Sequence, residues 1–144
     1  MLTLRIKRLR DDVELPARAH ADDAGLDLRC ADAFELAPGE RRVIGTGIAV
    51  AFPPGHAALV LPRSGLAAKK GVTVINTPGL VDAGYRGEVG IPLINHSAET
   101  YRAEAGERIA QLVLIAVPAS ELVEVAELDE TDRGDGGFGS SGSR

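Results

Sequence analysis

The sequence has almost no cysteine and no long apolar run. Cys30 is the only cysteine among 144 residues, so an internal disulfide is excluded and a reducing cytoplasm is the expected location. The first ten residues contain no apolar core of the length that a signal peptide needs. No apolar run approaches the length of a membrane span, so we expect no membrane partner.

Aromatic residues and positive charge are also scarce. The chain has two Tyr, three Phe and no Trp, so its core must consist mainly of Val, Leu, Ile and Ala. The net charge is -5 and the pI is about 5.2. Proteins that bind nucleic acid usually present a basic face to the phosphates, so we expect no nucleic-acid partner. A small anionic ligand is still compatible with this charge, because it needs only a local basic pocket.

The chain length and the spacing of its apolar residues indicate one all-β domain. Short strand-like runs alternate with Gly and Pro, and almost no helical period is visible. The expected strands cover residues 2–7, 24–28, 41–52, 57–61, 109–117 and 122–128. Gly45 and Gly47 are candidate bulges within one of these runs. A sandwich or jelly roll is therefore the predicted architecture.

A single short helix is predicted after the strand at residues 57–61. Residues 62–71 read P-R-S-G-L-A-A-K-K-G. Ser64 is the candidate N-terminal cap, and Gly71 is the candidate stop.

Residues 76–89 are the most informative stretch of the chain. They contain one Pro and three Gly, so the backbone turns here at least once. Strand-like runs at residues 72–75 and 89–94 flank the stretch and suggest a hairpin.

The same stretch carries more polar chemistry than a turn requires. Asn76 supplies an amide, Asp82 a carboxylate, Tyr85 a phenol and Arg86 a guanidinium. A simpler interpretation is that Asp82 closes a local turn and that Tyr85 packs on a sheet face. The apolar neighbours of Asp82 offer it little screening or pairing, which favours a functional site.

The last sixteen residues differ in composition from the domain at residues 1–128. Eight of the residues from 129 to 144 are Gly or Ser, which predicts a flexible arm. Phe138 and Arg133 are unusual in a purely solvating tail. Together they would suit a ligand that has both an aromatic face and negative charge. The arm is not a Walker-type phosphate loop, because it lacks the G-K-[ST] ending.

Five short motifs in this order resemble those of the trimeric dUTP diphosphatase (dUTPase) family. They are A-G-L-D-L at residues 24–28, P-R-S-G-L-A at 62–67, N-T-P-G-L-V-D-A-G-Y-R-G at 76–87, G-E-R-I-A-Q-L at 106–112 and R-G-D-G-G-F-G-S-S-G at 133–142. Two positions depart from the usual pattern. Ser141 stands where the family often has Thr, which keeps the hydroxyl. Gly90 stands where a longer side chain is common, so only a backbone contact is available there.

The resemblance implies a fold, an assembly and a reaction. The implied protomer is a jelly roll, and three copies form a homotrimer with active sites at the subunit interfaces. The arm would close over a neighbour's site. The implied reaction is the Mg²⁺-dependent hydrolysis of dUTP to dUMP and pyrophosphate. This reaction limits uracil incorporation into DNA and supplies dUMP for thymidylate synthesis.

The resemblance also assigns roles to individual residues. Asp82 would orient and deprotonate the attacking water, which suits a carboxylate that is ionised at neutral pH. Asp27 would hold Mg²⁺ through water, with the triphosphate as the main metal ligand. Without the resemblance, Asp27 would be interpreted as an ordinary loop carboxylate.

Substrate binding is implied for three further sets of residues. The implied phosphate-binding residues are Arg63, Ser64, Gly65 and Gln111. The implied base- and sugar-binding residues are Asn76, Gly79, Leu80, Val81, Tyr85 and Gly90. The implied arm residues are Arg133, Phe138, Gly139, Ser140 and Ser141. Tyr85 would pack against the deoxyribose and exclude a ribose 2′-OH, and Phe138 would stack on uracil.

Two other functions are compatible with the fold. One is a dCTP deaminase-like enzyme, which would release ammonia rather than pyrophosphate. The other is a catalytically silent trimeric nucleotide-binding protein. Asp82, Tyr85 and the intact arm motif favour the diphosphatase over both.

Overall fold

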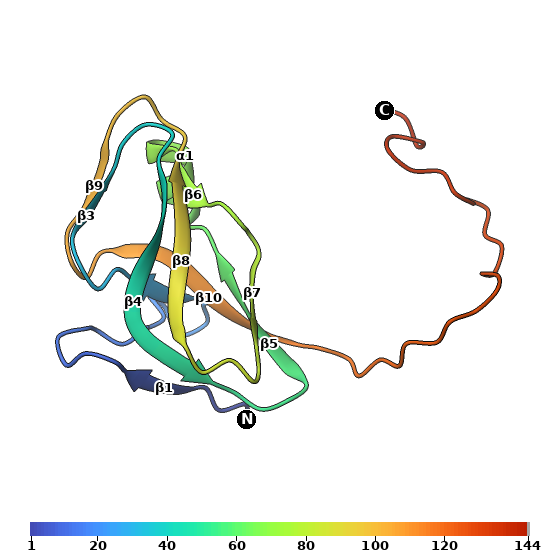
Figure 1. Cartoon of the computed structure of the whole chain (residues 1–144), viewed down its shortest axis with the longest axis horizontal. Helices are drawn as coiled ribbons and strands as arrows, with labels where there is room; N and C mark the ends of the chain where they lie inside the picture. The colour runs from blue at the N-terminus through green and yellow to red at the C-terminus, as the bar shows by residue number, and fades with distance from the viewer. Residues whose placement is uncertain (144) are drawn as a thin grey trace.

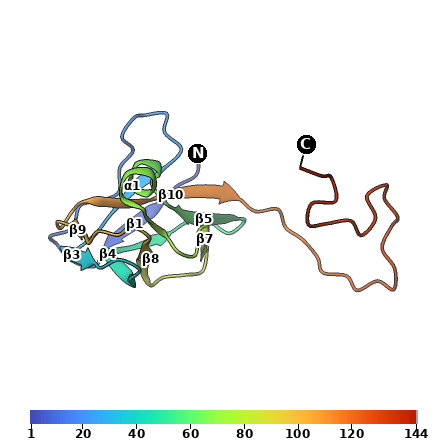
Figure 2. The same cartoon turned by 90° about the horizontal axis from the view of Figure 1, so that it is seen from above.

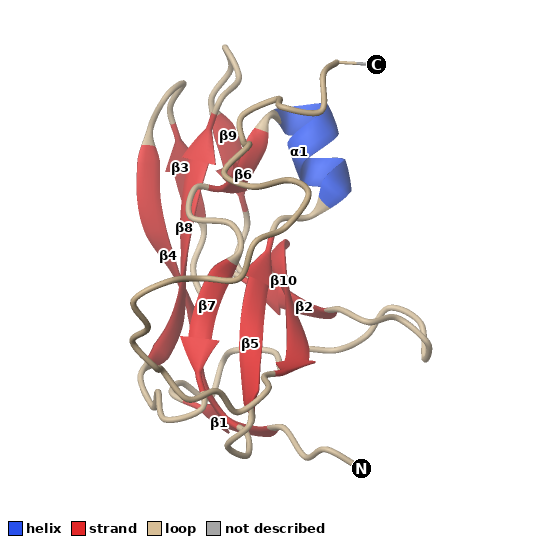
Figure 3. Ribbon diagram, turned by 90° about the vertical axis from the view of Figure 1, so that its right-hand side faces the viewer, coloured by secondary structure: helices blue, strands red, loops and turns tan. Residues whose placement is uncertain are grey.

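A computed structural model describes residues 1–143 and shows two four-stranded antiparallel sheets (Figures 1 and 3). The first sheet has the order β1 (Arg5–Arg8), β4 (Arg41–Ala51), β8 (Glu88–Asn95) and β6 (Val72–Val74). The second has the order β2 (Leu26–Arg29), β10 (Arg108–Ala116), β5 (His56–Leu61) and β7 (Gly79–Asp82). A small third sheet pairs β3 (Phe34–Leu36) with β9 (Tyr101–Ala103). The all-β prediction is confirmed, although β3 and β9 were not predicted.

The core lies between the two large sheets and is mainly aliphatic. Side chains alternate along β8, so that Val89, Ile91 and Leu93 are buried. They belong to the same cluster as Val60 of β5 and Leu112 of β10. This shared cluster shows that the two sheets pack face to face, as expected for a sandwich.

The predicted helix forms, but its N-cap was assigned wrongly. Helix α1 spans Ser64–Lys70, and Arg63 rather than Ser64 is the N-cap, with no side-chain capping bond. Gly71 ends the helix as predicted, at φ 65°, and its N–H donates to the Ala67 carbonyl at 3.0 Å. Within residues 1–143, no helix has both the length and the apolar character required to cross a bilayer.

The predicted bulge in β4 is present. Gly45 pairs with Gly90, but the next pair in register is Ala49 with Glu88, so β4 contains extra residues between the two pairs. Gly47 lies in this interval and adopts a positive φ of 68°. This backbone conformation favours glycine and explains its presence in the middle of a strand.

The hairpin predicted around residues 76–89 forms, but the connection between its two strands is not a simple turn. Strands β6 and β8 do pair with each other, with Val72 opposite Asn95. The chain between them, however, contributes β7 to the other sheet, where it pairs with β5. Gly79 is the first residue of β7 and lies opposite Val60 of β5.

The strand predicted at residues 122–128 is also absent from the protomer. The chain leaves the domain after β10, and Figures 1 and 2 show the following residues extending away from it. Leu122 is 97% exposed and Leu128 is 88% exposed. The apolar pattern is real, but residues 122–128 form no strand in the protomer.

Candidate active site

The turn after β7 borders a hollow of about 220 Å³. The hollow is lined by Leu80, Val81, Asp82, Tyr85, Glu88, Val89 and Gly90. Five of these residues were predicted to bind or act on a substrate. The structure therefore brings together the carboxylate, the phenol ring and the backbone of β7 and β8, which the sequence placed in one stretch.

Backbone and side-chain hydrogen bonds define the shape of this turn. The Tyr85 N–H donates to the Asp82 carbonyl at 3.0 Å. Arg86 Nη1 donates to the carbonyls of Ala83 at 2.7 Å and of Tyr85 at 2.8 Å. Arg86 therefore stabilises the turn and lines a different hollow, beside β1 and β4. The Asp82 carboxylate stays exposed at the end of β7, where it can reach a water molecule.

Tyr85 is fixed at both its backbone and its hydroxyl. Its hydroxyl donates to the Glu88 carbonyl at 2.8 Å, and 46% of the residue is exposed. The ring lies over Gly87, where an added Cβ would be only 2.6 Å from Tyr85 Cζ. A half-exposed ring held in this way presents a rigid face to any ligand in the hollow.

Of the remaining predicted base-binding residues, Leu80 and Gly90 line the same hollow, whereas Asn76 and Gly79 lie toward the other end of β7. Leu80 is 64% exposed, which is unusual for a leucine on a strand. Asn76 follows β6, and its amide nitrogen lies 3.4 Å from where a Gly79 Cβ would be. Gly90 packs closely on the neighbouring strand, since a Cβ there would lie 2.8 Å from Val43 Cγ1. Any polar contact from Gly90 must therefore come from its backbone.

A second cluster lies where three strands of the sheet that contains β7 are in register. Asp27 of β2 is opposite Gln111 of β10, which is opposite Leu61 of β5. Gln111 Nε2 donates to the Pro62 carbonyl at 2.9 Å. Gly25 leaves space for this amide, because a Cβ there would lie 2.4 Å from Gln111 Oε1.

Two guanidinium groups meet the Asp27 carboxylate in this cluster. Arg108 Nη1 lies 3.2 Å from Asp27 Oδ2, and Arg63 Nε lies 3.7 Å from Asp27 Oδ1. Arg63 Nη1 also donates to the Arg108 carbonyl at 3.0 Å. The two positive charges exceed the one negative charge, so this cluster can attract phosphate. Ser64 and Gly65 begin α1 beside it, where backbone N–H groups have no partner within the helix.

The two clusters lie at opposite ends of β5. Asp82 pairs with Ala57 near the start of this strand, whereas Arg63 follows its last residue, Leu61. Six residues of extended chain separate the two levels, which corresponds to roughly 20 Å. One protomer therefore does not bring Asp82 to the same phosphate group as Arg63.

The predicted arm residues touch neither cluster. Phe138 is 115% exposed, and Arg133 Nε donates locally to the Gly136 carbonyl at 2.8 Å. The Ser140 N–H likewise bonds to the Gly137 carbonyl at 3.1 Å, and Gly139 and Ser141 lie in the same turns. Figure 2 shows this segment on the far side of a long connection from the sheets.

Residues 1–143 contain no group of three or more His, Cys, Asp or Glu side chains that could hold a metal ion by themselves. Asp27 is the only carboxylate in the basic cluster described above, and its side chain is 19% exposed. Its long contact with Arg63 leaves Oδ1 free to accept a hydrogen bond from water. The residues present therefore suit a hydrated ion whose other ligands come from a substrate.

Two residues of these clusters were not singled out from the sequence. Arg108 lies within the fourth motif, and its position three residues before Gln111 was the available signal. Glu88 begins β8 and lines the hollow next to Tyr85. No spacing pattern marked it, because its partner on β4 is far away in the sequence.

Comparison with known proteins identifies the family. The family model described as dUTPase matches residues 11–142. The deoxyuridine 5'-triphosphate nucleotidohydrolase of Thermobifida fusca is 54% identical over 122 residues, covering 84% of this chain and 68% of the relative.

Solved structures agree with the sequence comparison. A mutant dUTPase of Staphylococcus bacteriophage 80alpha with dUpNHpp superposes with a TM-score of 0.91 at 34% identity, covering 97% of this chain and 98% of the other. A mutant dUTPase from phage phi11 of S. aureus, described with a structural Mg(II) ion, gives 0.83 at 30% identity, covering 89% and 99%. The chain belongs to the dUTPase family, with the jelly-roll fold that its motifs implied.

Proposed function

We propose that this protein hydrolyses dUTP to dUMP and pyrophosphate. The observation that carries the proposal is that Asp82 and Tyr85 line one hollow in a chain of the dUTPase family. The same reaction would remove dUTP, limit uracil incorporation into DNA and supply dUMP for thymidylate synthesis.

In the proposed mechanism, Asp82 acts as a general base. Its carboxylate is exposed at the edge of the hollow and accepts a proton from a water molecule. The water oxygen attacks the α-phosphorus, and the bond from this phosphorus to the bridging oxygen of pyrophosphate breaks. Arg63, Ser64, Gly65 and Gln111 hold the phosphate chain, and the guanidinium charge stabilises the negative charge that develops on it.

Uracil recognition follows from the backbone that faces the hollow. Backbone groups at Leu80, Val81 and Gly90, together with the Asn76 amide near Gly79, would pair with the base edge. Uracil and cytosine have opposite donor and acceptor positions at N3 and the adjacent exocyclic group. A mispaired buried group costs about 1–3 kcal/mol, which is enough to exclude cytosine. Tyr85 would cover the deoxyribose and collide with a ribose 2′-OH.

Mg²⁺ would enter this site with the triphosphate. The phage phi11 relative is described with a structural Mg(II) ion, and a dUTP analogue, dUpNHpp, accompanies the 80alpha relative. Asp27 would hold the hydrated ion through water, and Arg63 and Arg108 would keep the carboxylate oriented. When bound, the ion would supply positive charge that neutralises the phosphates.

We further propose that the active unit is a homotrimer. The separation of roughly 20 Å between Asp82 and the Arg63 cluster is too large for both to act on one α-phosphate within a protomer. A second copy that places its hairpin against the first copy's basic cluster would complete the site. Light scattering should then give three times 15.0 kDa, and a fully active monomer would refute the assembly.

The arm would complete the site by closing over bound substrate. Phe138 would stack on uracil, while Arg133, Gly139, Ser140 and Ser141 would contact the phosphates. Its exposed position in the protomer leaves it free to reach another copy. We propose the cytoplasm as the place of the reaction, because a chain with a single cysteine needs no oxidising compartment to form an internal disulfide.

A turnover assay with dUTP and Mg²⁺ tests the proposed function directly. Release of pyrophosphate without ammonia supports the diphosphatase. Release of ammonia from dCTP would instead identify a deaminase of the same fold. Binding of dUTP without turnover would leave only a nucleotide-binding protein.

A further inference from the structure

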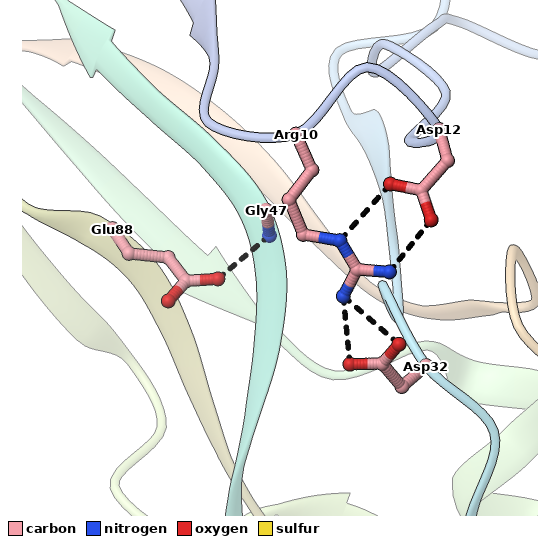
Figure 4. A network of polar contacts seen from close by, with 5 residues as sticks. All are labelled: Arg10, Asp12, Asp32, Gly47 and Glu88. Atoms are coloured by element: carbon pink, nitrogen blue, oxygen red, sulfur yellow. Dashed lines mark hydrogen bonds and ion pairs between the residues drawn. The ribbon is translucent and has the colours of Figure 1, made fainter.

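Glu88 begins β8, and its carboxylate reaches across to the bulge in β4. Its Oε1 accepts a hydrogen bond from the Gly47 N–H at 2.7 Å, as Figure 4 shows. Gly45 leaves room for the carboxylate, because a Cβ at this position would lie 2.9 Å from Oε1. Both glycines of the bulge therefore serve the same side chain: Gly47 donates the bond and Gly45 provides the space.

The backbone of Glu88 holds the ring of Tyr85. The Tyr85 hydroxyl donates to the Glu88 carbonyl at 2.8 Å. The ring also lies over Gly87, so its position depends on the backbone path of residues 87 and 88. Glu88 thus connects the β4 bulge, through its side chain, to the Tyr85 hydroxyl, through its carbonyl.

A second bond attaches the same end of β8 to the bulge. Thr46 Oγ1 donates to the Val89 carbonyl at 2.6 Å, and both residues are buried. This bond fixes the strand at residue 89, one position inside Glu88. The carboxylate bond to Gly47 extends the attachment to the exposed end of β8, where the Tyr85 hydroxyl donates to the Glu88 carbonyl. A hydrogen bond to an ionised acceptor is stronger than a neutral one and suits this role.

We propose that Glu88 is a positioning residue that sets the Tyr85 ring against the sugar. The proposal rests on the proposed function, in which Tyr85 distinguishes deoxyribose from ribose. Without the carboxylate anchor, the first residue of β8 is held to β4 only by its pairing with Ala49, so the carbonyl that accepts the Tyr85 hydroxyl is less firmly placed. The ring then no longer forms a rigid wall, and the preference for dUTP over UTP falls.

Three substitutions separate this role from general destabilisation. Glu88→Ala removes the acceptor for the Gly47 N–H, whereas Glu88→Gln keeps an oxygen in the same place. Glu35→Ala is the matched control, because it removes an exposed carboxylate that pairs with Arg102 on β9, away from the hairpin. The kcat/KM values for dUTP and UTP are measured for each protein, together with its Tm.

The expected result is a change in selectivity that depends on the acceptor. Glu88→Ala should lower the ratio of kcat/KM for dUTP over UTP by about threefold to tenfold, the effect of one hydrogen bond. Glu88→Gln should retain most of the ratio, and Glu35→Ala should leave it unchanged. Tyr85→Phe should lower the ratio similarly. The double variant Glu88→Ala/Tyr85→Phe should lose less than the sum of the two effects, because both act on one contact.

Fluorine NMR provides a readout that does not require turnover. The chain has two tyrosines, so 3-fluorotyrosine labelling distinguishes Tyr85 from Tyr101, with Tyr85→Phe as the assignment control. Glu88→Ala should shift the Tyr85 resonance but not that of Tyr101, and Glu88→Gln should shift it less.

Two results would overturn the positioning role. One is an unchanged Tyr85 resonance in Glu88→Ala, whether or not the enzyme turns over dUTP. The other is an equal loss of kcat/KM for both nucleotides with a lower Tm, which would make Glu88 merely structural. Failure of the parent protein to hydrolyse dUTP would refute the proposed function alone, and the NMR result would still decide the role of Glu88.

Discussion

Two inactive variants of this protein should restore each other's activity when they are assembled together. Asp82→Asn removes the proposed base, and such losses typically lower kcat by about 10²–10⁴-fold. Arg63→Ala removes a proposed phosphate ligand at the opposite end of β5. If each site combines Asp82 of one copy with Arg63 of another, a mixed trimer can contain sites in which both residues are intact.

The expected recovery follows from counting. In an equal mixture of the two variants, a given site has an intact Asp82 in about half of the cases and an intact Arg63 in about half, because each comes from a different copy. About one quarter of the sites are then complete, so activity should approach one quarter of the parent's. A site contained within one protomer would give no complete sites.

The experiment needs exchange of subunits and one further mixture. The variants are unfolded together in denaturant and refolded, and pyrophosphate release from dUTP is compared with each variant refolded alone. Parent protein mixed equally with the double variant Asp82→Asn/Arg63→Ala should give about one quarter of parent activity if sites are shared, and about one half if they are not. Thermal melts establish that each variant folds. Activity that stays at the mean of the two single variants would refute the shared site.

Three other predictions follow from individual residues. Tyr85→Ala should let UTP compete with dUTP, and an unchanged ratio of kcat/KM for the two nucleotides would place the sugar discrimination elsewhere. Deletion of residues 133–144 should leave Tm nearly unchanged, because Phe138 is fully exposed in the protomer. The same deletion should lower kcat/KM for dUTP by about tenfold to hundredfold or more, which corresponds to the loss of base stacking. Parent-like activity would contradict closure of the arm. Burial raises the pKa of the Cys30 thiol above its ordinary 9.0, so native Cys30 should resist iodoacetamide at pH 8 while the unfolded chain reacts. The free energy of unfolding should also fall as pH rises above about 9, because the unfolded chain releases this proton more readily, and Cys30→Ala should reduce that fall.

Local rules predicted the parts of this fold that depend on neighbouring residues. Gly71 ends α1 because a left-handed residue is needed there. Gly47 adopts a positive φ within the β4 bulge for a similar reason. The composition correctly indicated a mainly aliphatic core. Within residues 1–143, the buried aromatic side chains are those of Phe52 and Tyr101.

Pairing between distant strands could not be predicted by the same rules. Residues 72–94 contain two runs that do pair, but periodicity does not show that β7, between them, belongs to the other sheet. Strands β3 and β9 are three residues each, too short to show a period. Ser64 was predicted as the cap of α1 because Ser is a common N-cap. The structure instead has Arg63 at this position, and its side chain contacts Asp27 and the Arg108 carbonyl rather than capping the helix.

Two exposed apolar surfaces of the protomer have a common explanation. Residues 122–128 carry the apolar side chains of a strand, yet Leu122 and Leu128 are almost fully exposed in the protomer. Leu80 is also exposed, at the edge of the proposed uracil site. Large exposed apolar side chains indicate surfaces that a ligand or another chain covers. We infer that this pattern suits the proposed assembly, in which another copy or a ligand covers the apolar surfaces that one protomer leaves exposed. In the proposed trimer, the Asp82 turn of one copy and the Arg63 cluster of another would form one site, because the distance along β5 separates them within a protomer.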